Sequence, residues 1–328
     1  MSTLPVRRVG DIGESPVDTW LVDSLWTHQA VGLVAGHAKL GKSWLALDFA
    51  VSVATGTPVL DRFAVTDPGP VLLFPAEDSP TAVRDRLAGI CRHRGVDLAG
   101  LNVWVIESSI LRLDSREDCD ALGTTVEEFR PRLLILDPLI RLHSSDENSA
   151  VEIARILSFL RDLQRRYSAA VLVVHHARKS SSSDPGLGLR GSSEIRAWSD
   201  SSLYMRRNKG LELIVEHRGA PAPEPLRLVL ASDEPANTHL AIEGEAPASA
   251  AAPPDLEERI VELLRTSPPL SRDDIRRRLA VRNQAAGAVL AALTQDGLIE
   301  KCSTGFRLTD TTTKSARSIP TLCWEAPS

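Results

Sequence analysis

Two glycines, a lysine and a serine near the start of the chain have the types and the spacing that bind phosphate. They belong to the segment Gly36-His37-Ala38-Lys39-Leu40-Gly41-Lys42-Ser43, which matches the pattern Gly-x4-Gly-Lys-Ser/Thr. An apolar run at residues 30–35 precedes the segment, and residues 43–54 carry apolar side chains at helical spacing. The segment is therefore expected to join a buried strand to a helix, which is the context that this motif requires.

In that context the segment predicts a binding site for ATP and Mg²⁺. Glycines let main-chain N–H groups close around phosphate oxygens, and the start of the helix adds positive potential. Lys42 would reach the β- and γ-phosphates and Ser43 would coordinate the magnesium ion. We expect the nucleotide contacts to run from Gly36 through Trp44. A loop that matches the pattern by chance and binds nothing is the alternative.

An aspartate adds a carboxylate to the predicted magnesium site. Asp137 ends the apolar run Leu133-Leu134-Ile135-Leu136 and can hold the ion through water. The alternative is an aspartate that only caps the turn before Pro138.

Hydrolysis also needs a group that orients or deprotonates the attacking water. Glu77, just after the apolar run at residues 71–74, is the candidate, and the adjacent Asp78 is its rival. Asp78 precedes Ser79-Pro80 and could instead start a helix, and both acids could be helix-cap residues only. His175 and His176 end a further apolar run, and we expect His176 to sense the γ-phosphate.

The elements that must position these residues alternate between strand and helix. Apolar runs at residues 71–74, 133–136 and 169–174 are typical of central parallel strands. Helices are expected at residues 80–94, with Ser79 as the cap, and at 149–167. The fold class is therefore α/β with a mostly parallel, doubly wound sheet, whose carboxyl edge would bring Gly36, Glu77, Asp137 and His176 together. Residues 211–216 and 226–230 predict a hairpin at the edge of the sheet.

Composition divides the chain into a larger and a smaller domain. We expect an N-terminal segment at 1–19, an ATPase domain at 20–243, an Ala/Pro-rich linker at 244–254 and a disordered tail at 311–328. Between linker and tail, residues 255–310 show helices at 255–265, 271–279 and 283–296, then two short strands around Gly305. This order is typical of a winged helix.

The bulk properties exclude several classes of protein. The net charge of −5 over 328 residues argues against a protein that coats nucleic acid over its whole surface. The four cysteines lack the paired spacing of structural zinc sites and are expected to be reduced thiols. No uncharged apolar run is long enough to span a bilayer, and residues 1–20 lack the pattern of a secretory signal, so we expect a cytoplasmic protein without a membrane partner.

Taken together, these motifs resemble the RepA-like group of RecA-fold ATPases, plasmid and mobile-element relatives of the DnaB-type hexameric helicases. The resemblance spans about residues 20–230. Besides the glycine segment, it rests on Trp20-Leu21, Trp44-Leu45-Ala46-Leu47-Asp48, Ala76-Glu77-Asp78-Ser79-Pro80, Leu136-Asp137-Pro138-Leu139, His175-His176-Ala177-Arg178-Lys179 and Leu189-Arg190-Gly191-Ser192-Ser193.

The resemblance implies a catalytic carboxylate at Glu77, magnesium coordination near Asp137 and phosphate sensing at His176. It also implies a ring, usually a hexamer, in which an arginine from the next subunit completes the ATP site. Arg218 is the candidate for that arginine. The sequence has Glu216 where the wider helicase family has a lysine, so Arg206 and Arg207 are alternatives.

Related rings contact single-stranded DNA through loops that line the central channel. Residues 177–191 occupy the corresponding place here and include Arg178, Lys179 and Arg190. A flexible linker without a DNA role is the alternative. A cluster of arginines in the C-terminal domain could also contact DNA: Arg272, Arg276, Arg277, Arg278 and Arg282. Acidic residues in the same domain offset their charge.

The motifs and the domain order are compatible with two alternative functions. The first is an ATP-driven helicase or translocase on single-stranded DNA. The second is an ATP-gated DNA-binding regulator without unwinding activity, in which the winged helix recognises the site.

Overall fold

The computed structural model of the chain describes residues 6–11, 20–108, 110–144, 150–176, 192–232, 237–244, 256–265, 269–279, 289–290, 293–294, 297–302 and 305–309. The chain forms two compact units, Met1–Ala248 and Ser249–Ser328. Each unit has its own hydrophobic core.

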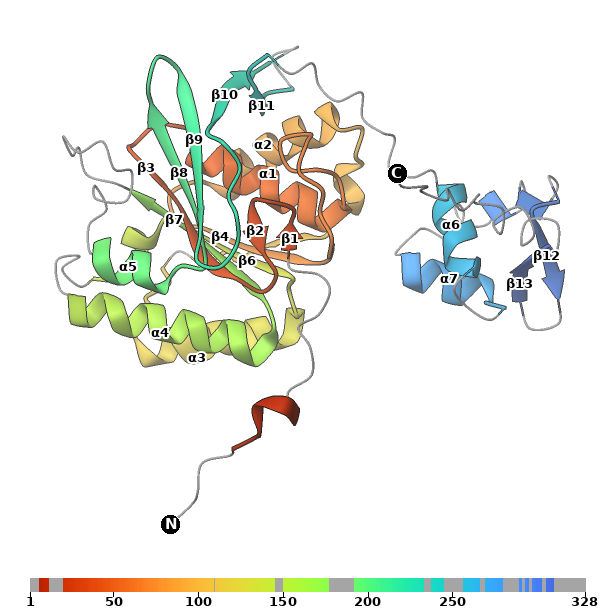
Figure 1. Cartoon of the computed structure of the whole chain (residues 1–328), viewed down its shortest axis with the longest axis horizontal. Helices are drawn as coiled ribbons and strands as arrows, with labels where there is room; N and C mark the ends of the chain where they lie inside the picture. Colours follow the sequence, from red (N-terminus) through yellow and green to blue (C-terminus); the bar gives the residue numbers. More distant parts are fainter. Residues whose placement is uncertain are drawn as a thin grey trace, which may run out of the picture. The chain divides into compact units, whose positions relative to one another are not determined.

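A large, mostly parallel sheet organises the first unit (Figure 1). Within the described ranges its strand order is β11-β10-β9-β8-β3-β7-β6-β4-β5, and the strands from β8 to β5 in this order are parallel. Strands β9, β10 and β11 extend the sheet in antiparallel fashion beyond β8. The strand bounds are β3 (Val31–Gly36), β4 (Val71–Pro75), β5 (Val103–Val105), β6 (Leu133–Asp137), β7 (Ala170–His176), β8 (Ser201–Arg207), β9 (Leu211–His217), β10 (Leu226–Ala231) and β11 (His239–Ile242).

Helices cover both faces of this sheet, which explains why its central strands are apolar throughout. All six residues of β3 are buried, as are the first four of β4 and β6. On one face α1 (Lys42–Thr55) and α2 (Pro80–His93) pack into one core; on the other, α3 (Arg116–Phe129), α4 (Ala150–Tyr167) and α5 (Ser192–Trp198) contribute to a second (Figure 1). The smaller elements are β1 (Trp20–Val22), β2 (Trp26–Thr27) and the 3-10 turns η1 (Val9–Asp11), η2 (Leu98–Gly100) and η3 (Leu139–Arg141).

The structure confirms the α/β class and the mostly parallel sheet that the sequence predicts. The apolar runs at 71–74, 133–136 and 169–174 are β4, β6 and β7. The Ser79 hydroxyl accepts a hydrogen bond of 3.2 Å from the N–H of Ala82, so Ser79 is the N-cap of α2 as expected. Helix α4 begins at Ala150, and the expected first residue, 149, lies outside the described residues.

The predicted hairpin exists, but its place in the sheet was predicted wrongly. Strands β9 and β10 pair antiparallel. They do not form the edge, because β11 adds one more strand beyond β10, with Leu230 opposite Leu240. A strand of four residues has too little alternation for sequence reasoning to detect.

A buried ion pair ties α1 to the end of α2. Arg94 Nη2 lies 2.5 Å from Asp48 Oδ1, and both side chains are almost fully buried. The second oxygen of Asp48 accepts a 2.8 Å hydrogen bond from the N–H of Leu60, and Arg94 also donates to Ser52 and Thr57. Burial raises the pKa of Asp48 and the Arg94 charge opposes this rise, so the carboxylate depends on its partner.

The second unit is small and built around two helices and a hairpin. Its elements are α6 (Leu256–Arg265), α7 (Arg272–Leu279), β12 (Ile299–Cys302) and β13 (Gly305–Leu308), and β12 pairs antiparallel with β13. Their core includes Ile260, Ile275 and Ile299. The expected third helix falls mostly outside the described residues, which include only 289–290 and 293–294 of it, both helical. The winged-helix assignment therefore stays a prediction.

The expected linker and tail also lie almost entirely outside the described residues, which hold only Gly244 of the linker. Among the helices that the described ranges contain, none combines the length and apolarity that a bilayer span demands.

Candidate functional site

The glycine segment forms a tight loop between the carboxyl end of β3 and the start of α1. Lys39 and Gly41 have φ angles of 62° and 85°, in the left-handed region. Gly36 is required for a different reason: a Cβ at this position would lie 2.3 Å from the main-chain oxygen of Met205 on β8. The loop thus depends on glycine both for its turn and for its close contact with the neighbouring strand.

Lys42 is the first residue of α1 and its side chain is buried beside the loop. Its ammonium donates a 2.7 Å hydrogen bond to the main-chain oxygen of His37. Burial lowers the pKa of Lys42 to about 8, against the charges of Asp137 and Glu77, which raise it. The ammonium therefore lies near both carboxylates that the sequence assigns to the reaction.

The lowered pKa predicts a pH dependence of nucleotide binding. Phosphate oxygens favour the ammonium form, so the pKa of Lys42 rises when a triphosphate binds. Below about pH 8 Lys42 is charged both in the free protein and in the ATP complex. Above about pH 8 the free protein has lost this proton and must take it up when ATP binds. The affinity for ATP is then expected to fall with rising pH, at a slope that approaches about tenfold per pH unit. Titration calorimetry with magnesium–ATP between about pH 7 and pH 9, in buffers of different ionisation enthalpy, measures both effects.

A Lys39→Ala variant serves as the control for this dependence, since Lys39 is an exposed residue of the same loop. It should retain the fall in affinity and the proton uptake. An affinity that stays constant up to about pH 9 would contradict the assignment of the titrating group to Lys42.

Ser43 and Asp137 provide oxygen donors next to Lys42. The Ser43 hydroxyl hydrogen-bonds the Asp137 carboxylate at the end of β6. Burial raises the pKa of Asp137 to about 6, the bond from Ser43 and the Lys42 charge lower it, and the charges of Asp78 and Glu77 raise it further. A hydroxyl and a carboxylate are hard oxygen ligands of the type that Mg²⁺ prefers, so these residues fit the predicted magnesium site.

Glu77 follows β4 and lies near residues that follow β6 and end β7. Arg141, in the turn η3 after β6, donates a 2.8 Å hydrogen bond from Nε to Glu77 Oε1. His176 Nε2, at the end of β7, lies 3.9 Å from Glu77 Oε2. Since His176 pairs in register with Gly36, Glu77 and His176 lie at the same edge of the sheet as the glycine loop.

Asp78 has different surroundings. Its two carboxylate oxygens accept hydrogen bonds of 2.5 Å and 3.0 Å from Arg86 on α2. The Arg86 guanidinium in turn lies 5.7 Å from the centre of the Trp44 ring, directly after the loop. Both oxygens of Asp78 are thus held by α2, whereas Glu77 pairs with Arg141 through one oxygen and has the other near His176.

Sequence reasoning did not single out Arg141. Arg141 and Glu77 line a cavity of about 520 Å³ together with Phe74, Ala76, Ile110, Leu111 and Arg112. The only local signal is its place four residues after Asp137, which does not specify that it contacts an acid on another strand.

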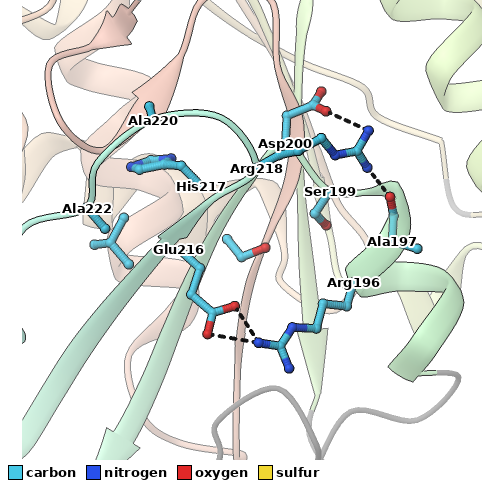
Figure 2. A pocket seen from close by; sticks show the side chains of 11 residues that line it. Arg196, Ala197, Ser199, Asp200, Glu216, His217, Arg218, Ala220 and Ala222 are labelled. Atoms are coloured by element: carbon cyan, nitrogen blue, oxygen red, sulfur yellow. Dashed lines mark hydrogen bonds and ion pairs between the residues drawn. The ribbon is translucent and has the colours of Figure 1, made fainter.

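The three candidates for the arginine that acts on the ATP of the next subunit lie at opposite edges of the sheet. Arg206 and Arg207 are the last two residues of β8, and the residue before them, Met205, lies opposite Gly36 in the sheet. Both arginines therefore lie at the edge of the sheet that carries the glycine loop. Arg206 forms an ion pair with Glu212. Arg218 follows β9 near the pair Ser201–His217, which is the opposite edge. There it lies 3.6 Å from Asp200 Oδ1 and donates to the main-chain oxygen of Ala197 (Figure 2).

Arg218 lines a second cavity of about 490 Å³ at this opposite edge (Figure 2). Arg196 lies in the same cavity, 3.2 Å from Glu216. Arg218 and the glycine loop thus lie at opposite ends of the strands, so Arg218 does not lie beside the loop of its own chain. The predicted DNA loop at residues 177–191 lies outside the described residues, as do Arg282 and the side chains of Arg276 and Arg277.

A glycine loop between a parallel strand and a helix, with a buried lysine near an aspartate at the end of another strand of the same sheet, defines the class of P-loop nucleoside triphosphatases. A family model described as AAA domain matches residues 2–182, more than half of the chain, and the chain belongs to that family.

Among solved structures, the chain is similar to one entitled "The Structure Of A DnaB-Like Replicative Helicase And Its Interactions With Primase". The TM-score is 0.51 at 15% sequence identity, over 65% of this chain and 57% of that chain. At this identity the likeness shows a shared RecA-type fold, and this chain spans little more than half of the length of that helicase.

Proposed function

We propose that this protein is an ATP-hydrolysing motor that acts on single-stranded DNA, related to the RepA-like replicative helicases of plasmids, phages and integrated elements. The observation that supports it best is that Lys42, the pair Ser43–Asp137, and Glu77 with His176 meet at one edge of the sheet, directly beyond the glycine loop.

In this proposal the loop amides and the Lys42 ammonium bind the triphosphate and stabilise the charge that develops on it. Ser43 and Asp137 hold Mg²⁺, which when bound neutralises phosphate charge. Glu77 orients the attacking water and accepts its proton, and His176 beside it senses the γ-phosphate. Arg218 acts on the ATP of the next subunit in a ring, which we expect to be a hexamer.

Replacing Glu77 by glutamine should leave ATP binding within about threefold of the original affinity and slow turnover about a hundredfold or more. The amide keeps the shape of the side chain and cannot accept a proton. Calorimetry measures the binding and a phosphate-release assay measures the turnover.

Asp78→Asn is the matched control for this variant. Arg86 binds both carboxylate oxygens of Asp78, whereas Arg141 binds one oxygen of Glu77 and the other lies near His176. Replacement of Asp78 should therefore change turnover only a few-fold. The opposite ranking of the two variants would transfer the catalytic role from Glu77 to Asp78.

A motor must also couple hydrolysis to movement on DNA. Strand displacement on a forked substrate, with ATP and with the Glu77→Gln variant as the inactive control, tests this step. Displacement by the original chain alone supports the motor. ATPase activity without displacement on forks of either polarity eliminates it.

The ring can be tested separately by light scattering of the Glu77→Gln variant, in which ATP should persist. Assembly on adding ATP is expected, and an Arg218→Ala exchange should lower turnover while leaving assembly intact. If Arg218→Ala has no effect on turnover, Arg206 and Arg207 become the candidates, because they lie at the edge of the glycine loop.

The second candidate function is an ATP-gated regulator that binds DNA without unwinding it. The separate C-terminal unit favours it, because this unit has a core of its own and the basic residues Arg272 and Arg278 on α7. Sequence-specific DNA binding that depends on ATP, without strand displacement, would support this function.

A further inference from the structure

Away from the glycine loop, three segments that are distant in the sequence bring two histidines and an aspartate together. Asp61 lies in the loop after α1, His93 is the last residue of α2, and His239 is the first residue of β11. Each offers one ligand atom, and these atoms all lie within 4.8 Å of one another. The His93 and His239 rings are stacked, with centroids 3.4 Å apart and an interplanar angle of 15°.

The hydrogen bond of His239 fixes which of its nitrogens can bind an ion. Nδ1 lies 2.8 Å from the main-chain oxygen of Asn237. A carbonyl oxygen only accepts, so Nδ1 donates, and in the neutral ring Nε2 carries the lone pair. A carbonyl behind the ligating imidazole is the usual partner of metal-binding histidines, since it fixes both the tautomer and the orientation of the ring.

Asp61 supplies the carboxylate of the group. Its Oδ2 lies 2.7 Å from His93 Nε2, a hydrogen-bond distance, so the two atoms would move about 0.6 Å apart to reach the ~3.3 Å that separates two ligands on one tetrahedral ion. The side chains of His93 and Asp61 are 10% and 19% exposed and His239 is 3% exposed, so the group is largely enclosed but not sealed from solvent.

Arg94 brings a positive charge next to the group, because its Nε lies 3.6 Å from the other oxygen of Asp61. This arginine is paired with the buried Asp48 at 2.5 Å, so its charge is already compensated on the side away from the histidines. Asp61 Oδ2 is thus the oxygen that faces His93, within the group of three.

We propose that Asp61, His93 and His239 form a binding site for one divalent transition-metal ion of the Zn²⁺ type. Two imidazole nitrogens and one carboxylate oxygen suit zinc and its neighbours in the transition series and do not suit Mg²⁺, which prefers oxygen ligands. The fourth position is left for water. The ion would join the outermost strand, β11, to the end of α2 and so fix the edge of the antiparallel extension.

The test uses the full, untagged chain after treatment with a chelator, in excess Mg²⁺ so that the Ser43–Asp137 site does not take up the probe. Titration with Co²⁺, followed by its visible absorption, and Zn²⁺ competition against a chromophoric chelator report ligand type and affinity. We expect one ion for each chain, no thiolate charge-transfer band, and a rise in Tm of about 5 °C at a hundredfold excess of Zn²⁺ over Kd.

His239→Ala and Asp61→Asn should each weaken binding at least about tenfold and remove the rise in Tm. The matched control is His28→Ala, because His28 and Asp67 form a His–Asp pair of the same kind at 3.1 Å that, among the residues the structure describes, belongs to no such group of three. That variant should keep both the stoichiometry and the rise in Tm.

Three results would overturn the proposal: no bound Co²⁺ or Zn²⁺ at about micromolar to hundred-micromolar concentrations, a thiolate band, or equal binding by His239→Ala. Circular dichroism of each variant establishes that it is folded. Should His239→Ala fail to fold, the Asp61→Asn variant decides the outcome, since it keeps the shape of the side chain.

Discussion

Exchange of Lys42 for alanine is expected to reduce ATP hydrolysis by on the order of a thousandfold, because it removes the ammonium that lies near both carboxylates at the glycine loop. The effect should appear in ATP affinity as well as in turnover, since the charge contacts the triphosphate in the ground state and in the transition state. Calorimetry and a phosphate-release assay separate the two contributions.

The same exchange should not weaken the fold. Burial lowers the pKa of Lys42, which means that the folded chain disfavours its charged form at neutral pH. Alanine removes that unfavourable burial, so the variant is expected to unfold at the same or a higher temperature. A variant that lost both activity and stability would point to a structural role for Lys42. Lys39→Ala, three residues after β3 in the exposed part of the loop, controls for damage to the loop itself.

Exchange of Asp48 for alanine is expected to destabilise the first unit by about 3–5 kcal/mol. The variant leaves the Arg94 guanidinium buried without its closest carboxylate, and it also removes the acceptor of the Leu60 N–H. Denaturation by urea, followed by tryptophan fluorescence, measures the change. Trp26 is a suitable reporter, because it is fully buried and packs against Phe49, the neighbour of Asp48.

Glu243→Ala is the control for the loss of a surface ion pair. Glu243 pairs with Arg227 at 3.9 Å, and both side chains are more than half exposed, so the loss should cost less than about 1 kcal/mol. If the two variants lost similar amounts of unfolding free energy, the Asp48–Arg94 pair would stabilise the protein no more than a surface pair does.

Most of the parallel sheet could be predicted from the sequence, since central strands that are buried on both faces read as unbroken apolar runs such as residues 71–74 and 133–136. Elements with weaker patterns escaped prediction. Strand β5 has three residues and β11 has four, and α3 carries only two fully buried side chains, Leu122 and Val126. Short or mostly exposed elements take their structure from the neighbours they pair with, and no local periodicity encodes that pairing.

The sequence by itself determined the phosphate loop and the acids at the strand ends, because a contiguous motif fixes its own backbone and because parallel strands end at a common edge. Only the tertiary structure decided the partners of these groups. Glu77 with Arg141, Asp48 with Arg94, and Asp61 with His93 and His239 each join residues 32 to 178 positions apart. The reason is physical: such contacts depend on strand register and on the packing of helices against the sheet, which arise only when the whole chain folds.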